Sequence, residues 1–562
     1  MPCDGRRGRT SPLGAGAITN SGSKRVTVEE TRNLVTGKSG DSRFFAISMR
    51  VGCLVGILAC RALAIPAFPG AEGYGANALG GRSGDVYYVT SLSNDGPGSL
   101  RYGISNAQGP RTILFQVSGN IKLLSGLAIH APRITIAGQT APGDGICLQD
   151  YPVILDASDL IVRHIRTRLG TNALQQADAM TIAGGTNIMV DHCSASWSVD
   201  ETLSPTYYTQ NLTVQWTYIT ESLNNSIHKK GPHGYGSLIR PRADASYSFH
   251  HDLYAHHSSR NPRAGTYGAN LLRLDFRNNL IYDWGIKAGY NYYTYENLAL
   301  NYVSNYLIAG PATTCYSCAF DSVATNTLIY QSGNCFDVNK NGRVDGTDTG
   351  WAMFIGDHKK AEIPFDAPPV TTDAPEVAYE RVLAQAGAMP WRRDAVDARV
   401  TETVRKQTGQ IIDDVRQVGG WPALNSGTPQ VDTDNDGMPD YWEEAVALNP
   451  NDPSDGNQIA GTGYTQLEEY LNWLADPHAV GSRNAPLDVD LRALNGNCGK
   501  HLTFKVTGGV NGTVTLLADH HTARFKPKKD FSGCASFAFT ATDPETHSAF
   551  GPVDVRVLVR KP

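Results

Sequence analysis

Short runs in which apolar and polar residues alternate recur between about residues 110 and 311. Most of these runs begin 22 to 35 residues apart, and glycine, asparagine and aspartate fill the segments between them. Alternation within a run is typical of strands, and a repeat of this length is typical of stacked units. Turns such as Arg277-Asn278-Asn279 fit the tight corners of a coiled sheet, because asparagine tolerates a left-handed backbone. The pattern predicts an all-β protein built on a parallel β-helix. A propeller or sandwich is the alternative, but it needs hairpin turns every 8 to 12 residues or so, which are mostly absent.

The pattern changes after the strand-rich region. Residues 374–420 carry helical spacing, which predicts helices that pack on the coil or cap its end. Residues 430–476 contain an acidic loop and a short helix-like run, and the last segment alternates like the strands of a small β-sandwich. We therefore expect three folded parts: a β-helix domain with a C-terminal helical segment over 65–420, an acidic linker over 421–480 and a β-sandwich over 485–562.

The first residues have the features of a leader. Residues 1–48 are polar and aperiodic, whereas Met49-Arg50 opens an apolar run that ends in Ala62-Leu63-Ala64. A charged start, about ten apolar residues and an A-x-A site are typical of a secretory signal. The run is shorter than the 20 or so residues that a membrane span needs. We expect 1–64 to be an over-extended start plus a signal peptide, and the protein to be secreted, extracellular or periplasmic. A lipid anchor at Cys60 is the less favoured alternative.

Composition and charge narrow the possible partners. The 562 residues include 57 glycines and 25 tyrosines, which agrees with turn-rich β structure. The formal net charge of −5 provides no global basic field. Bulk nucleic-acid binding is therefore not expected, and any attraction for polyanions has to be local.

A dense group of histidines and arginines lies between residues 228 and 263. Six of the fifteen histidines precede Arg260-Asn261-Pro262-Arg263 in this stretch. Proline fixes its own φ and favours an extended residue before it, so the two guanidiniums are held in defined directions. Arginine binds carboxylates through two parallel hydrogen bonds. The stretch predicts a site for an anionic sugar polymer, with a surface ion pair as the alternative. Paired histidines in a strand point to opposite faces, which argues against zinc.

Acidic residues suggest a cation upstream of this stretch. Asp178 and the pair Asp200-Glu201 fall on neighbouring runs, and side chains one coil apart lie about 5 Å from each other. Carboxylates at that distance repel unless a hard cation lies among them, and calcium accepts six to eight oxygens. Calcium and solvated turns are the two interpretations that the spacing allows.

Two later loops have the spacing of calcium ligands. The first places acids at positions 1, 3, 5, 9 and 12 of an EF-hand-type loop, with glycine at position 6, and predicts a structural calcium ion. Its residues are Asp432, Asp434, Asp436, Gly437, Asp440 and Glu443. The second is less charged and equally fits a polar loop. Its residues are Asp337, Asn339, Asn341, Gly342, Asp345 and Asp348.

Export also affects how the cysteines are interpreted. Cys498 and Cys534 are alone together in the last 80 residues, and we expect them to form a disulfide. Cys315, Cys318 and Cys335 lie close in sequence. A local disulfide or free thiols is favoured there over a zinc site, because no second CxxC exists.

Several motifs in one order resemble the pectate lyases of polysaccharide lyase family 1, and especially a bacterial branch. The likeness covers about 67–420. The motifs are AFPGAEGYG from 67 to 75, Gly80-Gly81-Arg82, GPGSLR from 96 to 101, ITIAGQTAPGDGI from 134 to 146, DHCSASWSVDE, GPHGYG and HHSSRNPR. The resemblance implies a right-handed parallel β-helix and calcium-assisted β-elimination on polygalacturonate.

The resemblance also implies roles for individual residues. Arg260 matches the base that removes the proton at C5 of the uronate, and Arg263 would draw charge from the substrate carboxylate. Asp178, with Asp200 and Glu201, matches the ligands of a catalytic calcium ion. The substrate-binding lysine has no unique match, and the candidates are Lys229, Lys230, His228 and His233. This chain has Gly265 where the family commonly has a further arginine, so a polyuronate other than pectate is an alternative substrate.

We therefore expect a secreted, monomeric lyase with Ca²⁺ as cofactor and pectate, an acidic polysaccharide, as substrate. The alternative from another class is a non-catalytic β-helix that binds a polysaccharide or a surface. A β-helix glycosidase is disfavoured, because it needs paired carboxylic acids that we do not find near Arg260. The first acidic loop resembles dockerin or thrombospondin-type calcium repeats, and the last segment resembles cadherin-like or Ig-like modules.

Overall fold

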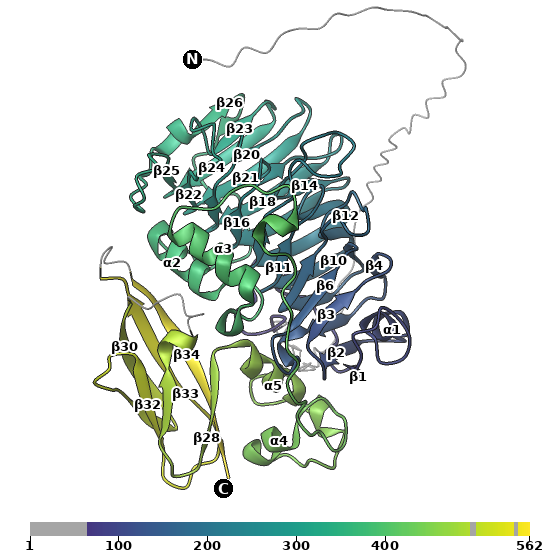
Figure 1. The fold of residues 1–562 in the computed structure, drawn as a ribbon, viewed down its shortest axis with the longest axis vertical. Coiled ribbons are helices and arrows are strands. Elements are labelled where there is room, and N and C mark those ends of the chain that lie inside the picture. The colour runs from purple at the N-terminus through teal and green to yellow at the C-terminus, as the bar shows by residue number, and fades with distance from the viewer. Residues whose placement is uncertain (1–64, 495–501, 545–548, 562) are drawn as a thin grey trace, which may run out of the picture. The chain divides into compact units, whose positions relative to one another are not determined.

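The computed structural model describes residues 65–494, 502–544 and 549–561. The expected leader and Cys498 lie outside these residues. Figure 1 shows short strands stacked into a coil over most of the described chain. Among the described residues, no helix combines the length and the apolar character that a membrane crossing needs.

The coil has three faces, and every strand pair within a face is parallel. Strands β10 (Met180–Asp191) and β12 (Leu203–Gln215) are long enough to bend from the second face into the first. The first face contains β1 (Asp85–Val89), β2 (Arg111–Phe115), β5 (Ile134–Ala137), β8 (Leu160–Arg163), β15 (Ala245–His250), β18 (Leu271–Arg277), β21 (Asn297–Val303), β24 (Thr327–Ser332) and β27 (Lys359–Lys360).

The other two faces follow the same order along the chain. The second face contains β4 (Leu127–Ile129), β7 (Val153–Asp156), β14 (Leu238–Pro241), β17 (Arg263–Ala264), β20 (Gly289–Tyr290), β23 (Phe320–Ser322) and β26 (Phe354–Gly356). The third face contains β3 (Gly119–Lys122), β6 (Ile146–Gln149), β9 (Ile165–Arg168), β11 (Ser194–Ser196), β13 (Tyr218–Thr220), β16 (Leu253–Ala255), β19 (Leu280–Tyr282), β22 (Tyr306–Ile308) and β25 (Cys335–Asp337). The predicted parallel β-helix is confirmed.

Apolar side chains inside the coil stack directly on one another. On the first face, Val162, Val190, Val214, Phe249 and Phe276 lie in register on successive coils, and each is at most 2% exposed. Neighbouring strands are about 4.8 Å apart, so each side chain covers the next. A slip of one residue would turn this column outwards, and the buried column therefore fixes the register.

Left-handed residues form the corner between the first and third faces. His192, Trp216, His251, Asn278 and Ser304 occupy equivalent positions on successive coils, with φ between 49° and 57°. The left-handed asparagine corner expected at Arg277-Asn278-Asn279 is present, although other coils use histidine, tryptophan or serine there.

An asparagine ladder follows this corner. The Asn279 side-chain amide donates to Asn305 Oδ1 at 3.2 Å, and the Asn305 amide donates to Asn334 Oδ1 at 3.0 Å. The same two oxygens also accept backbone N–H groups, from Asn279 and Asn305. All three side chains are fully buried, so the ladder satisfies polar groups that the corner removes from water.

Helices cover the outside of the third face. Helices α2 (Pro375–Gln385) and α3 (Ala395–Arg405) lie over it in Figure 1. Their side chains Val382, Leu383 and Val400 share an apolar cluster with Leu253 and Leu280 of the coil. The remaining short helices of this part are α1 (Leu100–Ser105), η1 (Gly138–Thr140), η2 (Gly350–Met353), η3 (Pro390–Arg392) and η4 (Val415–Val418).

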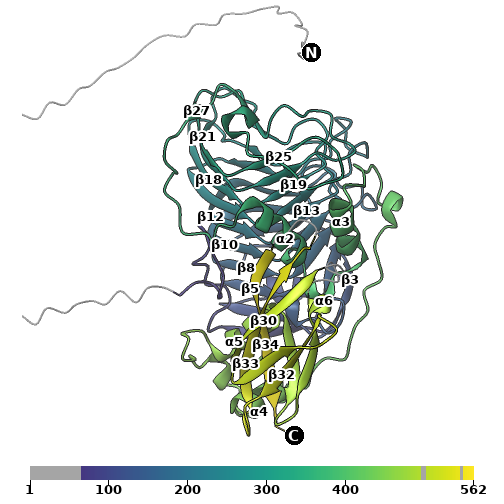
Figure 2. The same cartoon turned by 90° about the vertical axis from the view of Figure 1, so that its left-hand side faces the viewer.

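The C-terminal part begins with a helical linker. Met438, Trp442 and Leu467 share an apolar cluster with Leu114 and Ala137 of the coil. The linker elements are α4 (Asp440–Val446), η5 (Asp455–Asn457) and α5 (Gln466–Ala475). Two small sheets follow, visible in Figure 2, and enclose their own apolar core. Their strands are β28 (His478–Ser482), β29 (Leu487–Asp490), β30 (Thr503–Val510), β31 (Gly512–Leu516), β32 (Thr522–Pro527), β33 (Gly533–Thr542) and β34 (Ala549–Arg560), and the short helix α6 (Leu491–Leu494) follows β29.

The asparagine ladder makes a testable prediction about stability. Asn305→Ala removes the acceptor of the buried Asn279 backbone N–H and the amide donor that reaches the Phe276 carbonyl and Asn334 Oδ1. Each buried group left unpaired costs about 1–3 kcal/mol. We expect Asn305→Ala to lower the free energy of unfolding by about 3 kcal/mol in urea denaturation. The control is Asn326→Ala at an exposed position, where a change within about 0.5 kcal/mol is expected. Equal stability of the two variants would contradict the proposed importance of the ladder.

Candidate functional site

Arg260 lies on the corner that leads from the third face to the second. Parallel bridges join Glu201 to Tyr235 and Tyr235 to Ser259, so three successive coils present neighbouring residues here. The Arg260 guanidinium lies 3.9 Å from the centre of the Tyr235 ring and forms an ion pair with Glu201. Its Nε donates to the Tyr290 hydroxyl at 3.3 Å. The arginine is therefore held between a carboxylate and two tyrosines.

The three predicted carboxylates come together beside Arg260. One oxygen each from Asp178, Asp200 and Glu201 lies within 4.8 Å of the other two. Burial, and next the charge of Asp200, raise the pKa of Asp178 to about 8. Burial opposes ionisation of Asp200 as well, yet the hydrogen bond and charge of His233 and the charge of Arg260 hold its pKa below the usual value. Crowded carboxylates that resist joint ionisation fit a hard divalent cation, for which carboxylate oxygens are preferred ligands.

His228 and His233 support this group from behind. Their rings stack with centroids 4.0 Å apart, and His233 Nε2 lies 3.0 Å from Asp200 Oδ1. His228 Nε2 is 3.7 Å from the other oxygen of Asp200. Both histidines are only 7% exposed, whereas Lys229 and Lys230 between them are exposed. The structure thus places the histidines as supports of Asp200 and the lysines at the surface.

Arg263 lies apart from the carboxylates around Arg260. Its Nη2 donates to Glu296 Oε1 at 2.8 Å, and Arg240 Nε donates to the same oxygen at 2.8 Å. The side chain is buried on β17, and this burial lowers the pKa of Arg263 despite the opposing effect of Glu296. Its Nη1 is buried without a hydrogen-bond partner. Arg263 therefore forms part of a second charged group, which it shares with Arg240 and Glu296.

Sequence reasoning missed Tyr235, Tyr290 and Lys287. Tyr290 pairs with Arg263 in the second face and touches Arg260, so it lies between the two arginines. Lys287 occupies the coil after Arg260 and pairs with Asp321. Tyr235 stands within the Gly-Pro-His-Gly-Tyr-Gly motif, but only the register between coils places its ring under Arg260.

The acidic linker gathers two overlapping groups of carboxylates. One contains Asp432, Asp434 and Asp436, and the other contains Asp436, Glu443 and Asp455. Burial is the main reason that the pKa of Glu443 rises to about 8 and that of Asp436 to about 7. Buried oxygens without a donor are Asp434 Oδ2, Asp436 Oδ2, both carboxylate oxygens of Glu443 and Asp455 Oδ1. Such a set of unpaired oxygens fits calcium.

The carboxylates that come together in this linker differ from the predicted ligands at one position. Asp440 does not join either group, because its two oxygens accept hydrogen bonds from the backbone and the hydroxyl of Thr433, both at 2.8 Å. Asp455 takes part instead. In the less charged loop, the amides of Asn339 and Asn341 donate to Asp345 at 2.8 and 2.9 Å, so that loop closes on its own hydrogen bonds.

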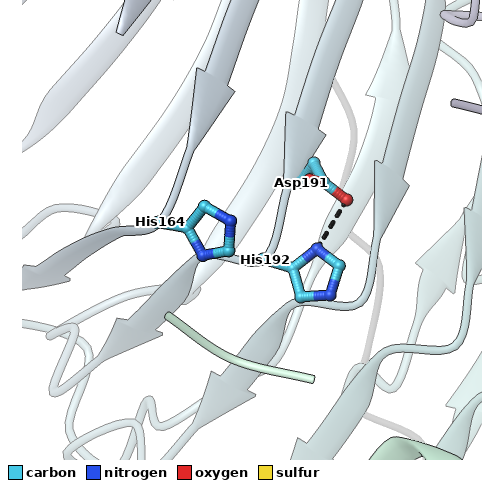
Figure 3. A group of neighbouring side chains, drawn as sticks. All are labelled: His164, Asp191 and His192. Atoms are coloured by element: carbon cyan, nitrogen blue, oxygen red, sulfur yellow. Dashed lines mark hydrogen bonds and ion pairs between the residues drawn. The ribbon is translucent and has the colours of Figure 1, made fainter. Parts of the chain in front are cut away.

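A third group with metal-like composition contains His164, Asp191 and His192 (Figure 3). The Met389 N–H donates to His164 Nδ1 at 3.2 Å, so in the neutral ring Nε2 carries the proton and offers no lone pair. Burial lowers the pKa of His164 far below its usual value, which keeps the ring neutral. Metal-bound histidines usually donate through their second nitrogen, and His164 accepts there. The geometry therefore favours a structural role.

Asp191 is the centre of this structural group. Arg163 Nε and Gln215 Nε2 both donate to it at 2.7 Å, and His192 Nδ1 lies 2.8 Å away. Burial opposes its ionisation, but the charges of His192 and Arg163 hold the pKa of Asp191 far below its usual value. Both carboxylate oxygens of Asp191 are therefore occupied by protein groups, which disfavours a cation at this position.

No two cysteines within the described residues form a disulfide with each other. Cys315 Sγ lies 3.2 Å from the Ser317 hydroxyl, and Cys318 and Cys335 are buried. Cys534 is exposed. Its predicted partner Cys498 lies outside the described residues, so the expected disulfide stays a prediction.

Comparison with known proteins gives a consistent set of relatives. The chain is 37% identical over 421 residues to "Probable pectate lyase C" of Neosartorya fischeri, which covers 73% of this chain and 94% of the relative. It is also 37% identical over 419 residues to "Probable pectate lyase C" of Aspergillus fumigatus, with the same coverage. Among solved structures, the cedar pollen allergen Jun a 1 is 19% identical with a TM-score of 0.44, over 57% of this chain and 92% of that one. No family model matches the chain.

The Asp191 group makes a prediction about stability and its pH dependence. Removal of one partner from a buried ion pair costs about 3–5 kcal/mol, so we expect Asp191→Asn to lower the free energy of unfolding by about 3 kcal/mol or more at pH 7. Because the folded pKa is depressed, the contribution of Asp191 is present above the ordinary pKa of about 4 and is lost as pH falls below it.

The control for this prediction is Asp85→Asn. Asp85 pairs with Arg111 at the surface, and its side chain is 55% exposed, so a loss below about 1 kcal/mol is expected. Denaturant titrations between pH 7 and pH 3 provide the measurement. If Asp191→Asn and wild type lose stability in parallel over this range, the assigned role of Asp191 is wrong.

Proposed function

This chain belongs to the pectate lyase family, because it is 37% identical to a pectate lyase relative and covers 94% of that relative's length. We propose that the site around Arg260 cleaves pectate by β-elimination with calcium. The protein is a lyase that degrades polysaccharide, and the parallel β-helix carries the site. The observation that supports this assignment most is the position of Arg260 against Glu201, beside Asp178 and Asp200, on successive coils.

Asp178, Asp200 and Glu201 are the residues that would hold the catalytic calcium ion. A calcium ion among them would draw negative charge from the uronate carboxylate and make the C5 proton more acidic. His233 and His228 keep Asp200 ionised and in place from the buried side. Glu201 would hold the ion with a carboxylate that here pairs with Arg260, and the guanidine would then be available to the substrate.

Arg260 is the proposed base. It accepts the proton from C5, the electron pair of that bond forms the C4–C5 double bond, and the bond from C4 to the glycosidic oxygen breaks. The guanidine reacts in its neutral form, so its guanidinium proton first passes to water and the proton from C5 replaces it. The departing oxygen takes up a proton from the hydronium ion formed in that way, so atoms and charge balance. The Tyr235 ring and the Tyr290 hydroxyl orient the guanidine, since they contact it from two sides.

Several cations on the coils around this base suit an anionic substrate, some close to Arg260 and others farther along the second face. Lys229 and Lys230 are exposed and can bind carboxylates along the polymer. Lys287 lies one coil beyond Arg260. Arg263 and Arg240 share the single carboxylate Glu296, so their group keeps one uncompensated positive charge. We propose that Arg263 acts on the substrate through this charge and through Tyr290.

The linker is proposed to hold a structural calcium ion. Asp432, Asp434, Asp436, Glu443 and Asp455 supply its ligands, and the orphaned oxygens of the last four support this assignment. The loop would then correspond to a dockerin-like or thrombospondin-like repeat over 421–480, between a catalytic domain over 65–420 and an Ig-like or cadherin-like module over 485–562.

Secretion and a monomeric state complete the proposal. The features of residues 49–64 support a signal peptide within 1–64, with a lipid anchor at Cys60 as the alternative. The bacterial branch of the family is proposed from the motif order alone.

The first functional prediction concerns the base. Loss of a general base typically costs about 100- to 10,000-fold in rate, so we expect Arg260→Ala to reduce the formation of unsaturated ends from polygalacturonate by a factor in that range. Ultraviolet absorbance of the C4–C5 double bond measures this formation, and circular dichroism checks the fold. Arg416→Ala, at an exposed arginine of the surface, is the control and should behave as wild type.

Two results would count against the proposal. If Arg260→Ala keeps most of the activity, the assigned base is wrong. If the wild-type protein binds polyuronates with calcium but releases no unsaturated product from any of them, the non-catalytic binding function is correct.

The second functional prediction separates the two calcium sites. A ligand present at about 100 times its Kd stabilises a protein by about 2.7 kcal/mol, so we expect chelator to lower the melting temperature of wild type. Glu443→Gln should melt at a lower temperature in calcium and respond little to chelator. Asp178→Asn should keep the wild-type thermal response to chelator and lose lyase activity. The proposed roles of the two sites are wrong if Asp178→Asn loses the thermal response to chelator and Glu443→Gln keeps it.

A further inference from the structure

Tyrosines and arginines alternate along the corner between the second and first faces. We call this set the tyrosine–arginine column, and it consists of Tyr207, Arg242, Tyr267, Arg240 and Tyr293. These residues come from four successive coils, at or just after the ends of the second-face segments of β12, β14, β17 and β20. The column therefore runs along the axis of the β-helix, on the opposite edge of the second face from Arg260.

Each guanidinium of the column lies against two tyrosine rings. The Arg242 guanidinium is 4.9 Å from the ring centres of both Tyr207 and Tyr267. The Arg240 guanidinium is 3.7 Å from the ring centre of Tyr267 and 4.6 Å from that of Tyr293. Cation–π contacts of this kind hold both arginines in defined orientations.

The column carries more positive than negative charge. Arg240 and the neighbouring Arg263 share one carboxylate, that of Glu296. Arg242 is exposed and has no ion pair with any residue that the structure describes. The nearest acid in sequence, Asp244, accepts the backbone N–H of Leu271. Three guanidiniums thus stand against one carboxylate, and Arg263 Nη1 is buried without a partner.

The aromatic surfaces of the column are open to solvent. Tyr207 is 45% exposed and Tyr293 is 39% exposed, and Tyr292 and Tyr295 beside them are 64% and 48% exposed. Exposed rings next to arginine forks provide both an apolar surface and donors for a carboxylate. A pyranose ring with a carboxylate group needs both.

We propose that the tyrosine–arginine column is a second binding site for uronate residues of the polysaccharide, remote from the bond that is cleaved. The sugar rings lie on the tyrosines, and Arg242 binds a carboxylate. This proposal rests on the proposed function and adds a substrate contact to it. The net positive charge of the column selects an anionic polymer over a neutral one.

The distance from the reacting centre decides which substrates reach the column. The Ser237 N–H donates to the Arg260 carbonyl at 2.7 Å, and strand β14 leads from Leu238 to Pro241, next to Arg242. Five residues of strand at about 3.3 Å each give roughly 16 Å. A long chain can contact both Arg260 and the column, whereas a short oligosaccharide centred on Arg260 cannot. The column therefore favours polymeric substrate.

Kinetics on substrates of two lengths test this proposal. Hydrogen bonds to charged groups contribute about 1.5–3 kcal/mol, which corresponds to about 10- to 100-fold in affinity. We expect Arg242→Ala to lower kcat/KM on polygalacturonate at least about tenfold more than on trigalacturonate, mainly through KM. The matched control is Arg273→Ala on β18, an exposed arginine that also lacks an ion pair within the described chain.

Binding in a cleavage-deficient background makes the test independent of catalysis. In Arg260→Ala, the further change Arg242→Ala should weaken binding of polygalacturonate about tenfold in calorimetry, and Arg273→Ala should not. Tyr293→Leu should also weaken it. Fully methyl-esterified pectin should bind equally well with and without Arg242, because it lacks free carboxylates.

Each outcome decides the proposal. Equal polymer binding by the Arg242→Ala and Arg273→Ala variants would overturn it, as would an equal loss of kcat/KM on the polymer and the trisaccharide. If the wild-type protein cleaves no polyuronate, the proposed function fails. The calorimetric comparison of Arg242→Ala with Arg273→Ala would then still show whether the column binds polyuronate.

Discussion

In-register parallel pairing of successive coils is the constraint on which the rest of this structure depends. It places side chains that are a full coil apart in sequence about 4.8 Å apart in space. Inside the coil, this spacing stacks Val190, Val214 and Phe249 into a dry column. At one corner it stacks the asparagine ladder. On the outside it brings Glu201, Tyr235 and Arg260 together.

Buried charge anchors the helices that cover the third face. Arg166 and Arg168 of β9 are almost inaccessible, and Arg168 Nη2 donates to Asp397 of α3 at 2.8 Å. Arg168 also pairs with Asp394, the N-cap residue of α3. A charge group of this kind gains little net free energy, because desolvation offsets the attraction. It does penalise any other placement of α3, since each misplacement would leave a buried charge unpaired.

The second face separates two kinds of chemistry at its two edges. One edge combines the carboxylates with Arg260, where negative groups and a single arginine suit a cation and a base. The other edge carries the tyrosine–arginine column, where arginines exceed carboxylates and aromatic rings are exposed. Glu296 is the carboxylate of this second group, where it binds Arg263 and Arg240 on neighbouring coils. The strands between the edges set the distance between them.

Sequence patterns alone predict the β-helix, the left-handed corner at Asn278 and the nearness of Asp178, Asp200 and Glu201. Each of these follows from local patterns: alternation, turn chemistry and the length of one coil. The spacing of Asp432, Asp434 and Asp436 likewise predicted their convergence, because the ligands of one loop are close in sequence.

Contacts between residues that lie several turns apart could not be predicted from these patterns. Arg240 and Glu296 are 56 residues apart, and their contact depends on the lengths of every turn between them. The same holds for Tyr290 beside Arg260, and for the position of Arg263 away from the carboxylates. Asp455, and not Asp440, lies beside Asp436 and Glu443, because the chain folds back past the end of the loop motif. Local spacing encodes neighbours within one turn, whereas the register between turns is settled by the packing of the whole coil.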